Sequence, residues 1–217
     1  MKRKMIIAAM AGIITVSAYG QSMVKETGRT SFGIRAGVNF QNINGKDAAG
    51  NDLKNDLLTG FNAGINAEVP LSSGFYLQPG VLYSAKGAKL SDGNKVKLSY
   101  IEVPVNFVYK PLLGSGNMLL GFGPYVGFGI HGKVESPNGS SEDIKFSNDF
   151  DASSGGPQMK RFDAGGNLLA GYEFANHVSF QLNAQLGLAD INPKTTAAND
   201  KTKLKNTGFG LSLGYRF

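Results

Sequence analysis

The chain has 217 residues, of which 41% are hydrophobic and 18% are charged, with 30 glycines and a formal charge of +6. This length fits one domain, or at most two, and a mean hydropathy of −0.13 excludes a polytopic helical membrane protein, which needs several segments of about 20 consecutive apolar residues. The composition does not exclude a transmembrane β-barrel, because the strands of such a barrel present only every second residue to lipid. The high glycine content favours strands and turns over helices.

The N-terminus has the three parts of a secretory signal peptide. Lys2, Arg3 and Lys4 form a basic cluster, residues 5–16 are apolar, and an Ala-Tyr-Gly sequence then provides a cleavage site. Twelve apolar residues are too few for a spanning helix, so we expect residues 1–20 to be removed and residues 21–30 to form a short lead. Removal of three basic residues and no acidic one lowers the charge from +6 to +3, and no nucleic-acid partner is expected.

Eight segments of the following chain alternate apolar and polar residues with the period of two that side chains have in a β-strand. They cover residues 32–40, 61–69, 75–83, 101–109, 118–130, 162–174, 178–188 and 209–217. The apolar faces carry no charge, whereas the opposite faces are rich in Gly, Asn, Gln and Ser. Because tilted strands of about nine residues or more can cross a membrane, the pattern predicts an all-β, eight-stranded antiparallel up-and-down transmembrane β-barrel over residues 31–217.

The periodicity alone does not say which face is inside, because a soluble barrel of the lipocalin kind would turn its apolar face inward. Three features favour the membrane barrel. Aromatic residues gather near the ends of the apolar faces, where a membrane interface favours them. The chain ends on Phe217, which resembles the assembly signal of bacterial outer-membrane barrels, so the barrel assembly machinery is an expected partner during biogenesis. The connections alternate between long and short, as extracellular loops and periplasmic turns do: 41–58, 70–74, 86–97, 110–117, 131–160, 175–177 and 189–206.

Two stretches resemble the central motif of the PorT-like outer-membrane β-barrel family of Gram-negative bacteria. Residues 75–87 read FYLQPGVLYSAKG, residues 100–104 read YIEVP, and the closing residues 208–217 also fit. Gly80 departs from the pattern, since the family more often has Glu there. The resemblance covers residues 33–217 and implies an outer-membrane location, but it implies little about activity.

Seven charged residues fall on the predicted inward faces: Arg35, Glu68, Glu102, Lys110, Asp163, Glu173 and Arg216. If the first strand runs outward from the periplasm, Arg35 and Glu102 should lie near mid-height. The periplasmic end should then collect Glu68, Lys110, Glu173 and Arg216. Side chains fill an eight-stranded barrel and unpaired charges inside it are costly, so we expect a charge network that plugs the lumen. A narrow channel or transporter for small or apolar solutes is the alternative, because inward glycines leave room locally.

The outer connections are the better candidates for binding, because loops on a rigid scaffold often carry function. Residues 131–160 form a polar connection longer than a strand link requires and are a candidate site for an unknown protein or surface ligand. Four lysines of the 86–97 connection are predicted to contact lipopolysaccharide phosphates: Lys86, Lys89, Lys95 and Lys97. The alternative is that they are solvated loop charges. Surface binding therefore competes with a purely structural role in the cell envelope.

No catalytic, cofactor or metal site is expected. The chain has no Cys, and its two histidines, His131 and His177, fall in or beside connections. No His-x-x-x-His pair or G-x-S-x-G elbow is present, which removes the familiar zinc and hydrolase motifs. Glu135 and Ser136 follow His131 closely, but such neighbours in loops are common by chance. The sequence thus predicts a small outer-membrane barrel that is not an enzyme.

Overall fold

The computed structural model of the protein describes residues 28–195 and 200–217. The predicted signal peptide lies outside the described residues, as does most of the predicted lead over 21–30. Among the described residues, no helix has the length and apolar character needed to cross a membrane.

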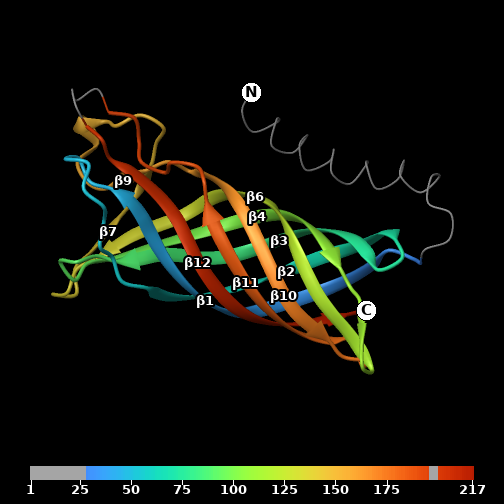
Figure 1. The fold of residues 1–217 in the computed structure, drawn as a ribbon. Coiled ribbons are helices and arrows are strands. Elements are labelled where there is room, and N and C mark those ends of the chain that lie inside the picture. The colour runs from blue at the N-terminus through green and yellow to red at the C-terminus, as the bar shows by residue number, and fades with distance from the viewer. Residues whose placement is uncertain (1–27, 196–199) are drawn as a thin grey trace.

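Eight long antiparallel strands form one closed barrel (Figure 1). Seven of the pairings join strands that follow one another in the barrel from the N-terminus to the C-terminus, and the pairing of the first long strand with the last closes the ring. The predicted all-β, eight-stranded up-and-down architecture is therefore confirmed. The long strands are β1 (Ser31–Lys46), β2 (Leu58–Ser72), β3 (Phe75–Lys89), β4 (Lys95–Tyr109), β6 (Gly116–Glu135), β10 (Phe162–Glu173), β11 (Val178–Gly187) and β12 (Lys203–Arg216).

Four short strands belong to the connections. The strand β5 (Leu112–Leu113) pairs with the start of β6, and β7 (Ser141–Asp143) pairs with its end. The strands β8 (Lys145–Phe146) and β9 (Gln158–Met159) pair in parallel with each other, and one turn of 3-10 helix, η2 (Ala152–Ser154), lies between them in the chain.

The barrel turns its apolar face outward. Phe32, Ile65 and Leu168 expose 63%, 62% and 64% of their surface, whereas the polar side chains of Gln181 and Ser212 on the opposite face are buried. A water-soluble barrel would show the reverse, because exposed apolar surface is costly in water. The lipocalin-like alternative is therefore wrong, and the outward wall is suited to lipid.

Aromatic pairs mark both ends of this apolar wall. Near the short turns, the ring of Phe75 stacks on that of Tyr109 with centroids 4.6 Å apart. Toward the other end, Phe61 and Tyr83 stack at 5.1 Å. Aromatic side chains favour the two membrane interfaces, so these pairs bracket the membrane-spanning part of the wall.

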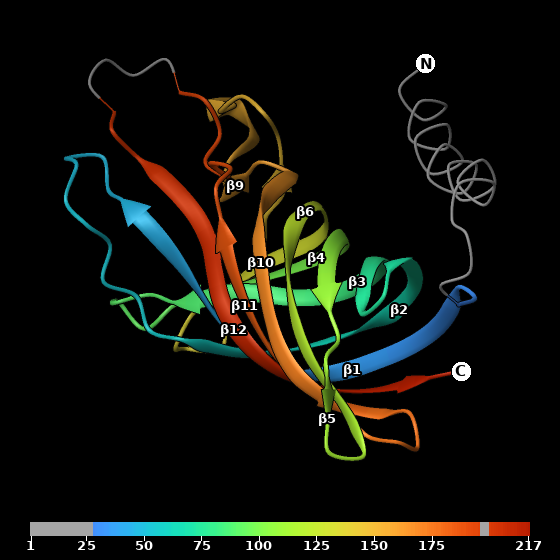
Figure 2. The ribbon, with the colours of Figure 1, turned by 45° about the vertical axis from the view of Figure 1, so that its right-hand side comes forward.

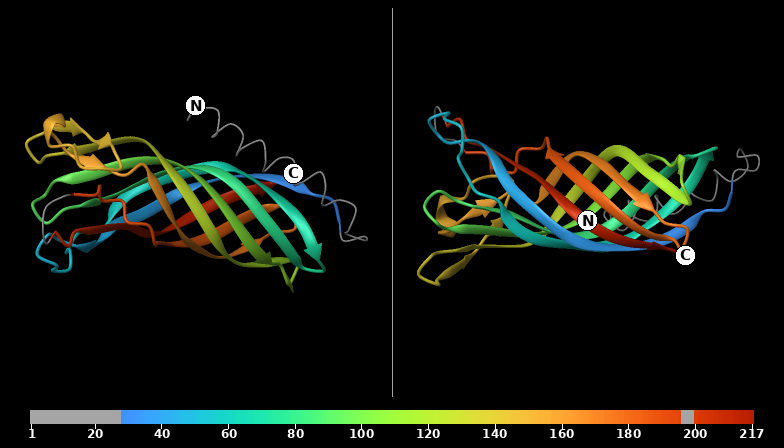
Figure 3. Two further views of the ribbon diagram at one scale, coloured as in Figure 1. Left: turned by 90° about the horizontal axis from the view of Figure 1, so that it is seen from above. Right: turned by 60° about the horizontal axis from the view of Figure 1, so that its bottom comes forward.

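The long connections gather at one end of the barrel and the short turns at the other (Figure 3). Residues 136–161 and 188–195 lie side by side at the long-loop end (Figure 2). Backbone hydrogen bonds join these two segments, from Phe150 N to Lys194 O at 2.8 Å and from Lys194 N to Asn148 O at 2.9 Å. The connection predicted over 86–97 is much shorter than expected, because β3 continues to Lys89 and β4 begins at Lys95.

Beyond the apolar wall the polarity of the strands inverts. In β4, Val96 and Leu98 point inward and are buried, whereas the charged Lys97 between them lies on the outer surface. The inward apolar residues meet side chains from the loops to form a small hydrophobic core: Ile43, Ala88, Val96, Leu98, Tyr100, Ile144, Met159 and Ile191. The strands therefore continue past the lipid and carry a core of the kind found in water-soluble proteins.

Candidate functional site

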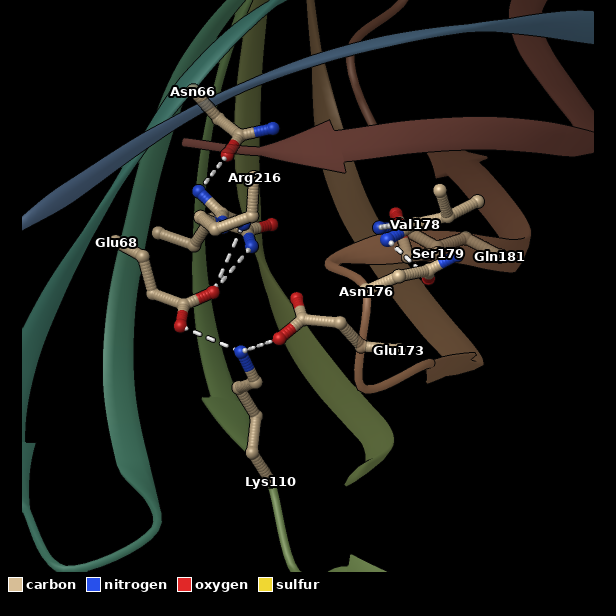
Figure 4. A network of polar contacts seen from close by, with 10 residues as sticks. Asn66, Glu68, Lys110, Glu173, Asn176, Val178, Ser179, Gln181 and Arg216 are labelled. Carbon is tan, nitrogen blue, oxygen red and sulfur yellow. Dashed lines mark hydrogen bonds and ion pairs between the residues drawn. The ribbon is translucent and has the colours of Figure 1, made fainter. Parts of the chain in front are cut away.

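An ion-paired cluster lies inside the barrel at the end with the short turns (Figure 4). The Lys110 ammonium lies 2.8 Å from both a Glu68 oxygen and a Glu173 oxygen. The Arg216 guanidinium lies 2.9 Å from the second Glu68 oxygen and donates a hydrogen bond of 2.7 Å to the Asn66 side-chain oxygen. Two cations and two carboxylates make the cluster neutral. Its members come from the ends of β2, β4, β10 and β12, where the barrel pattern brings distant parts of the chain together.

A second cluster lies deeper in the lumen around Lys86. Its Nζ atom is 2.5 Å from Glu102 Oε1 and 3.0 Å from Asp163 Oδ2, and all three side chains are at least 96% buried. The same ammonium lies 4.4 Å from the centre of the Tyr125 ring, a cation–π distance. Asn206 donates to Asp163 at 2.9 Å and completes a fully enclosed network.

The placement of Lys86 corrects the sequence analysis. The prediction that Lys86 contacts lipopolysaccharide is wrong, because its side chain is 0% exposed inside the barrel. It lies two residues after the inward Ser84 on β3, which continues past the point where the outward apolar run ends. The signal was therefore present in the sequence as the spacing of two from Ser84, which keeps a residue on the same face of a strand.

Arg35 belongs to neither cluster by an ion pair within the part of the chain that the structure describes. Its guanidinium donates a long hydrogen bond of 3.4 Å to the Asn183 side-chain oxygen. Arg35 and Glu102 line the same lumen cavity of about 30 Å³, which is room for one or two water molecules. With Arg35 included, the deeper lumen holds two cations and two carboxylates and is also neutral.

The outer end of the lumen is covered by the loops. Ile144 N donates a hydrogen bond to Gly132 O at 2.8 Å, and Ile191 N donates to Leu204 O at 2.8 Å. A Cβ on Gly132 would lie only 3.2 Å from the Ile144 Cβ, so the glycine leaves the space that the loop side chain fills. We call the hydrophobic core defined above, which contains Ile144 and Ile191, the outer cap.

Comparison with known families follows from this geometry. The family model described as an outer membrane protein beta-barrel domain matches residues 19–192. The chain belongs to this family. The protein is therefore an outer-membrane β-barrel, and its apolar wall faces the lipid of that membrane. By the general plan of such barrels, the long connections are extracellular and the short turns are periplasmic.

Solved outer-membrane barrels are similar to this outer-membrane β-barrel. Ail, the attachment invasion locus protein of Yersinia pestis, solved with the heparin analogue sucrose octasulfate, is 17% identical with a TM-score of 0.43. Neisserial surface protein A is 14% identical with a TM-score of 0.49. In both cases the alignment covers 88% of this chain and 100% of the other. A major outer membrane protein of Thermus thermophilus is 14% identical with a TM-score of 0.42, over 88% of this chain and 100% of that chain. No curated protein matches the sequence.

The histidines of this outer-membrane β-barrel lie apart from the lumen clusters. His131 is exposed on the outward side of β6, and His177 lies in the periplasmic turn after β10. Glu135, a neighbour of His131 in the sequence, pairs instead with Lys97 and Lys133. Across residues 28–195 and 200–217, no three His, Asp or Glu side chains form a group suited to a metal ion.

The other three lysines predicted to contact lipopolysaccharide lie near the extracellular end. Lys89 is exposed at the end of β3 with its ammonium 4.0 Å from Asp56. Lys95 is exposed at the start of β4, and Lys97 is half-exposed on the outward wall. Their positions are compatible with contacts to lipid headgroups. The contact of these three lysines with lipopolysaccharide stays a prediction.

A separate apolar hollow of about 540 Å³ lies on the lipid-facing wall. Outward side chains such as Phe107, Phe122, Leu168 and Phe209 line it, across strands β4, β6, β10, β11 and β12. The wall behind it is continuous, because β6 and β10 stay in register from Phe162 to Glu173. The hollow is therefore a depression in the wall and does not enter the lumen there.

Proposed function

We propose that the protein is a non-conducting, non-catalytic barrel that has a structural or surface-binding role through its extracellular loops. The main support for this proposal is that three barriers follow one another along the lumen. The periplasmic end has the Lys110 cluster, the Lys86 cluster lies farther along the lumen, and the extracellular end has the outer cap. Each charged group of the two clusters is held by an opposite charge, so an ion passing through would have to break buried pairs at a high cost.

The loops supply the surface for binding. Residues 136–161 and 188–195 are joined through their backbones and rest on the outer cap, which gives a ligand a preformed surface rather than a set of independent flexible loops. In this proposal an unknown protein or surface ligand contacts residues 131–160. Further proposed partners are lipopolysaccharide, at Lys89, Lys95 and Lys97, and the barrel assembly machinery during biogenesis.

The sequence motif at residues 75–87 supports a finer placement in the PorT-like group, which we keep as a proposal. The rival function is a narrow channel or transporter for small or apolar solutes. The apolar hollow on the wall is the feature that favours it, because a lateral exit would begin in such a depression. The unbroken pairing of β6 with β10 argues against that exit.

Planar-bilayer recording of the purified full chain tests the proposal. We expect no stable conductance for the wild-type protein. A variant in which Met replaces Lys110 and Gln replaces Glu68 leaves one cation, Arg216, and one carboxylate, Glu173, in the periplasmic cluster. It should also show no stable conductance, because the Lys86 cluster and the outer cap stay in place. A stable conductance of porin size in the wild-type protein would overturn the proposal in favour of the channel.

The binding part is tested on intact cells. Residues 147–157 are replaced by a short Gly-Ser linker, which leaves Ile144 and Met159 of the outer cap in place. Cell-surface crosslinking is then compared between this variant and the wild-type protein. A surface-binding role predicts a crosslinked species that disappears in the variant, and a species unaffected by the replacement contradicts binding at this loop.

A further inference from the structure

A second pocket lies on the outward wall, near the extracellular end. It has a volume of about 280 Å³ and is formed by residues of β2, β3, β4 and β6. Ala85 and Ser99 line the pocket from the outward face of β3 and β4, and their small side chains leave room for the depression. The pocket is amphipathic, because Phe61 and Tyr83 line one part while three basic side chains, Lys97, His131 and Lys133, line another.

The strand register gives the height of these side chains. Tyr83 pairs with Ile101, and Ile101 pairs with Phe128, so these three outward residues are cross-strand neighbours in the aromatic part of the wall. Lys97 is four residues further along β4, which is about 13 Å along the strand toward the extracellular turn. Since aromatic bands lie at the membrane interface, Lys97 and its neighbours lie at the level of the lipid headgroups.

The two lysines are arranged in an unusual way. Lys97 and Lys133 are direct partners across β4 and β6, with both side chains on the outward face. Like charges directly opposite each other destabilise a sheet. Here the Glu135 carboxylate lies between them and pairs with both ammonium groups, each at 2.5 Å. One carboxylate against two lysines leaves one positive charge.

Glu135 thus shows that an oxyanion fits between the two ammonium groups. A phosphate offers more oxygens and more charge than a carboxylate, and lysine recognises it as a point charge. The apolar part of the pocket lies directly below on the membrane side, where a lipid chain would be. Charge, height and shape together therefore favour a lipid over a free ion or a protein.

We infer that this pocket binds a phosphorylated lipid of the outer leaflet, with the phosphate at Lys97 and Lys133 and an acyl chain over Phe61 and Tyr83. This inference rests on the proposed function, which includes contacts with lipopolysaccharide. It assigns these contacts to one defined pocket on the outward wall. In the bound state the phosphate competes with Glu135 for the two lysines. His131 and Ser99, which are also cross-strand partners, line the pocket beside the lysines and offer further polar contacts.

Native mass spectrometry of the full chain in detergent micelles tests the site, with diphosphoryl lipid A as the probe. The variant Lys97→Gln/Lys133→Gln is expected to weaken binding by about tenfold, since each basic side chain near a membrane surface contributes about 1 kcal/mol and Glu135 already offsets part of it. The variant Glu135→Gln removes the competing carboxylate and is expected to strengthen binding several-fold. Opposite shifts from neighbouring positions cannot arise from general loss of folding.

The control variant Lys194→Gln/Lys201→Gln makes the same change in charge on exposed residues of the 188–202 connection. It is expected to bind the probe as the wild-type protein does. Equal affinity in the wild-type protein and in Lys97→Gln/Lys133→Gln overturns the inference, as does competition by millimolar inorganic phosphate alone, which would indicate a free-ion site. The same spectra report the oligomeric state. A wild-type dimer that becomes a monomer in Lys97→Gln/Lys133→Gln, with no change in lipid binding, overturns the inference in favour of a second copy of the chain.

These outcomes are separate from the conductance test. The lysine variants leave both lumen clusters intact, so they should stay non-conducting whether or not they bind lipid. A wild-type protein that conducts but binds lipid A at this pocket would overturn the closed lumen and leave the lipid site standing.

Discussion

Replacing Lys86 by Met should remove the central cation of the lumen and leave Glu102 and Asp163 facing each other. At separations of 2.5 and 3.0 Å, each ion pair is worth about 5 to 7 kcal/mol at an effective dielectric constant of 20, before desolvation is subtracted. Removing one partner of a buried pair typically costs 3–5 kcal/mol, because the remaining charges stay buried. We therefore expect the free energy of unfolding to fall by about 3–5 kcal/mol.

Urea unfolding in lipid vesicles, followed by the heat-modifiable gel migration of the folded barrel, measures this loss. The matched control is the double variant Lys86→Met/Asp163→Asn, which removes one cation and one carboxylate and leaves Glu102 with Arg35, which lines the same cavity. Because the deeper lumen then stays neutral, this variant should recover most of the lost stability. A loss below about 1 kcal/mol for Lys86→Met, or a double variant as unstable as the single one, would refute the ion-pair argument.

Three further predictions concern the two ends of the barrel. Lys110→Met should lower the free energy of unfolding by about 2–3 kcal/mol, less than Lys86→Met because water reaches the periplasmic end, and the same urea assay measures it. Gly132→Val should displace Ile144 and speed protease cleavage within residues 136–161, at a cost of about 1–3 kcal/mol from overpacking. The Ser153 hydroxyl and backbone N–H hold the pKa of Asp151 below its ordinary 3.8, so the turn is stabilised above that pH and should loosen as pH falls below it, measured by proteolysis at 151–154 across a pH series.

Each of these has a result that contradicts it. An unchanged urea midpoint for Lys110→Met would mean that Arg216 alone satisfies both carboxylates. Unchanged cleavage of Gly132→Val would mean that the outer cap does not hold the loop. If Asp151→Asn shows the same pH dependence of proteolysis as the wild-type protein, another group controls the turn.

The architecture was predictable because one physical rule operates along almost the whole chain. A strand that separates lipid from a narrow lumen must alternate, and segments such as 61–69 and 178–188 do so without interruption. The charged residues on the inward positions could be read from the same alternation. Their assembly into two groups followed from the strand directions, which place Glu68, Lys110 and Glu173 at one end.

The parts that could not be predicted lie where that rule stops. Lys86 was misplaced because the expected strand ended with its last outward apolar residue, Tyr83, whereas β3 continues to Lys89. The loop residues Ile144 and Ile191 have no periodic neighbours, so nothing in the local sequence shows that they fold back over the lumen. Cross-strand partners such as Lys97 and Lys133 depend on a register shift between Ser99 and Tyr100, which alternation does not reveal.

The inversion of polarity along β4 connects these observations. From Ile101 toward the periplasmic end of β4, the residues on the lipid-facing side are apolar, and Glu102 and Asn106 point into the lumen. From Ser99 toward the extracellular end, the residues that point into the barrel are apolar instead. The period stays at two throughout, so only the surroundings change, from lipid outside and polar groups inside to water outside and a hydrophobic core inside. The change of surroundings therefore locates the membrane boundary near Ser99. Lys97 and Lys133 lie just beyond that boundary, which is why their unfavourable pairing persists where anionic headgroups can offset it.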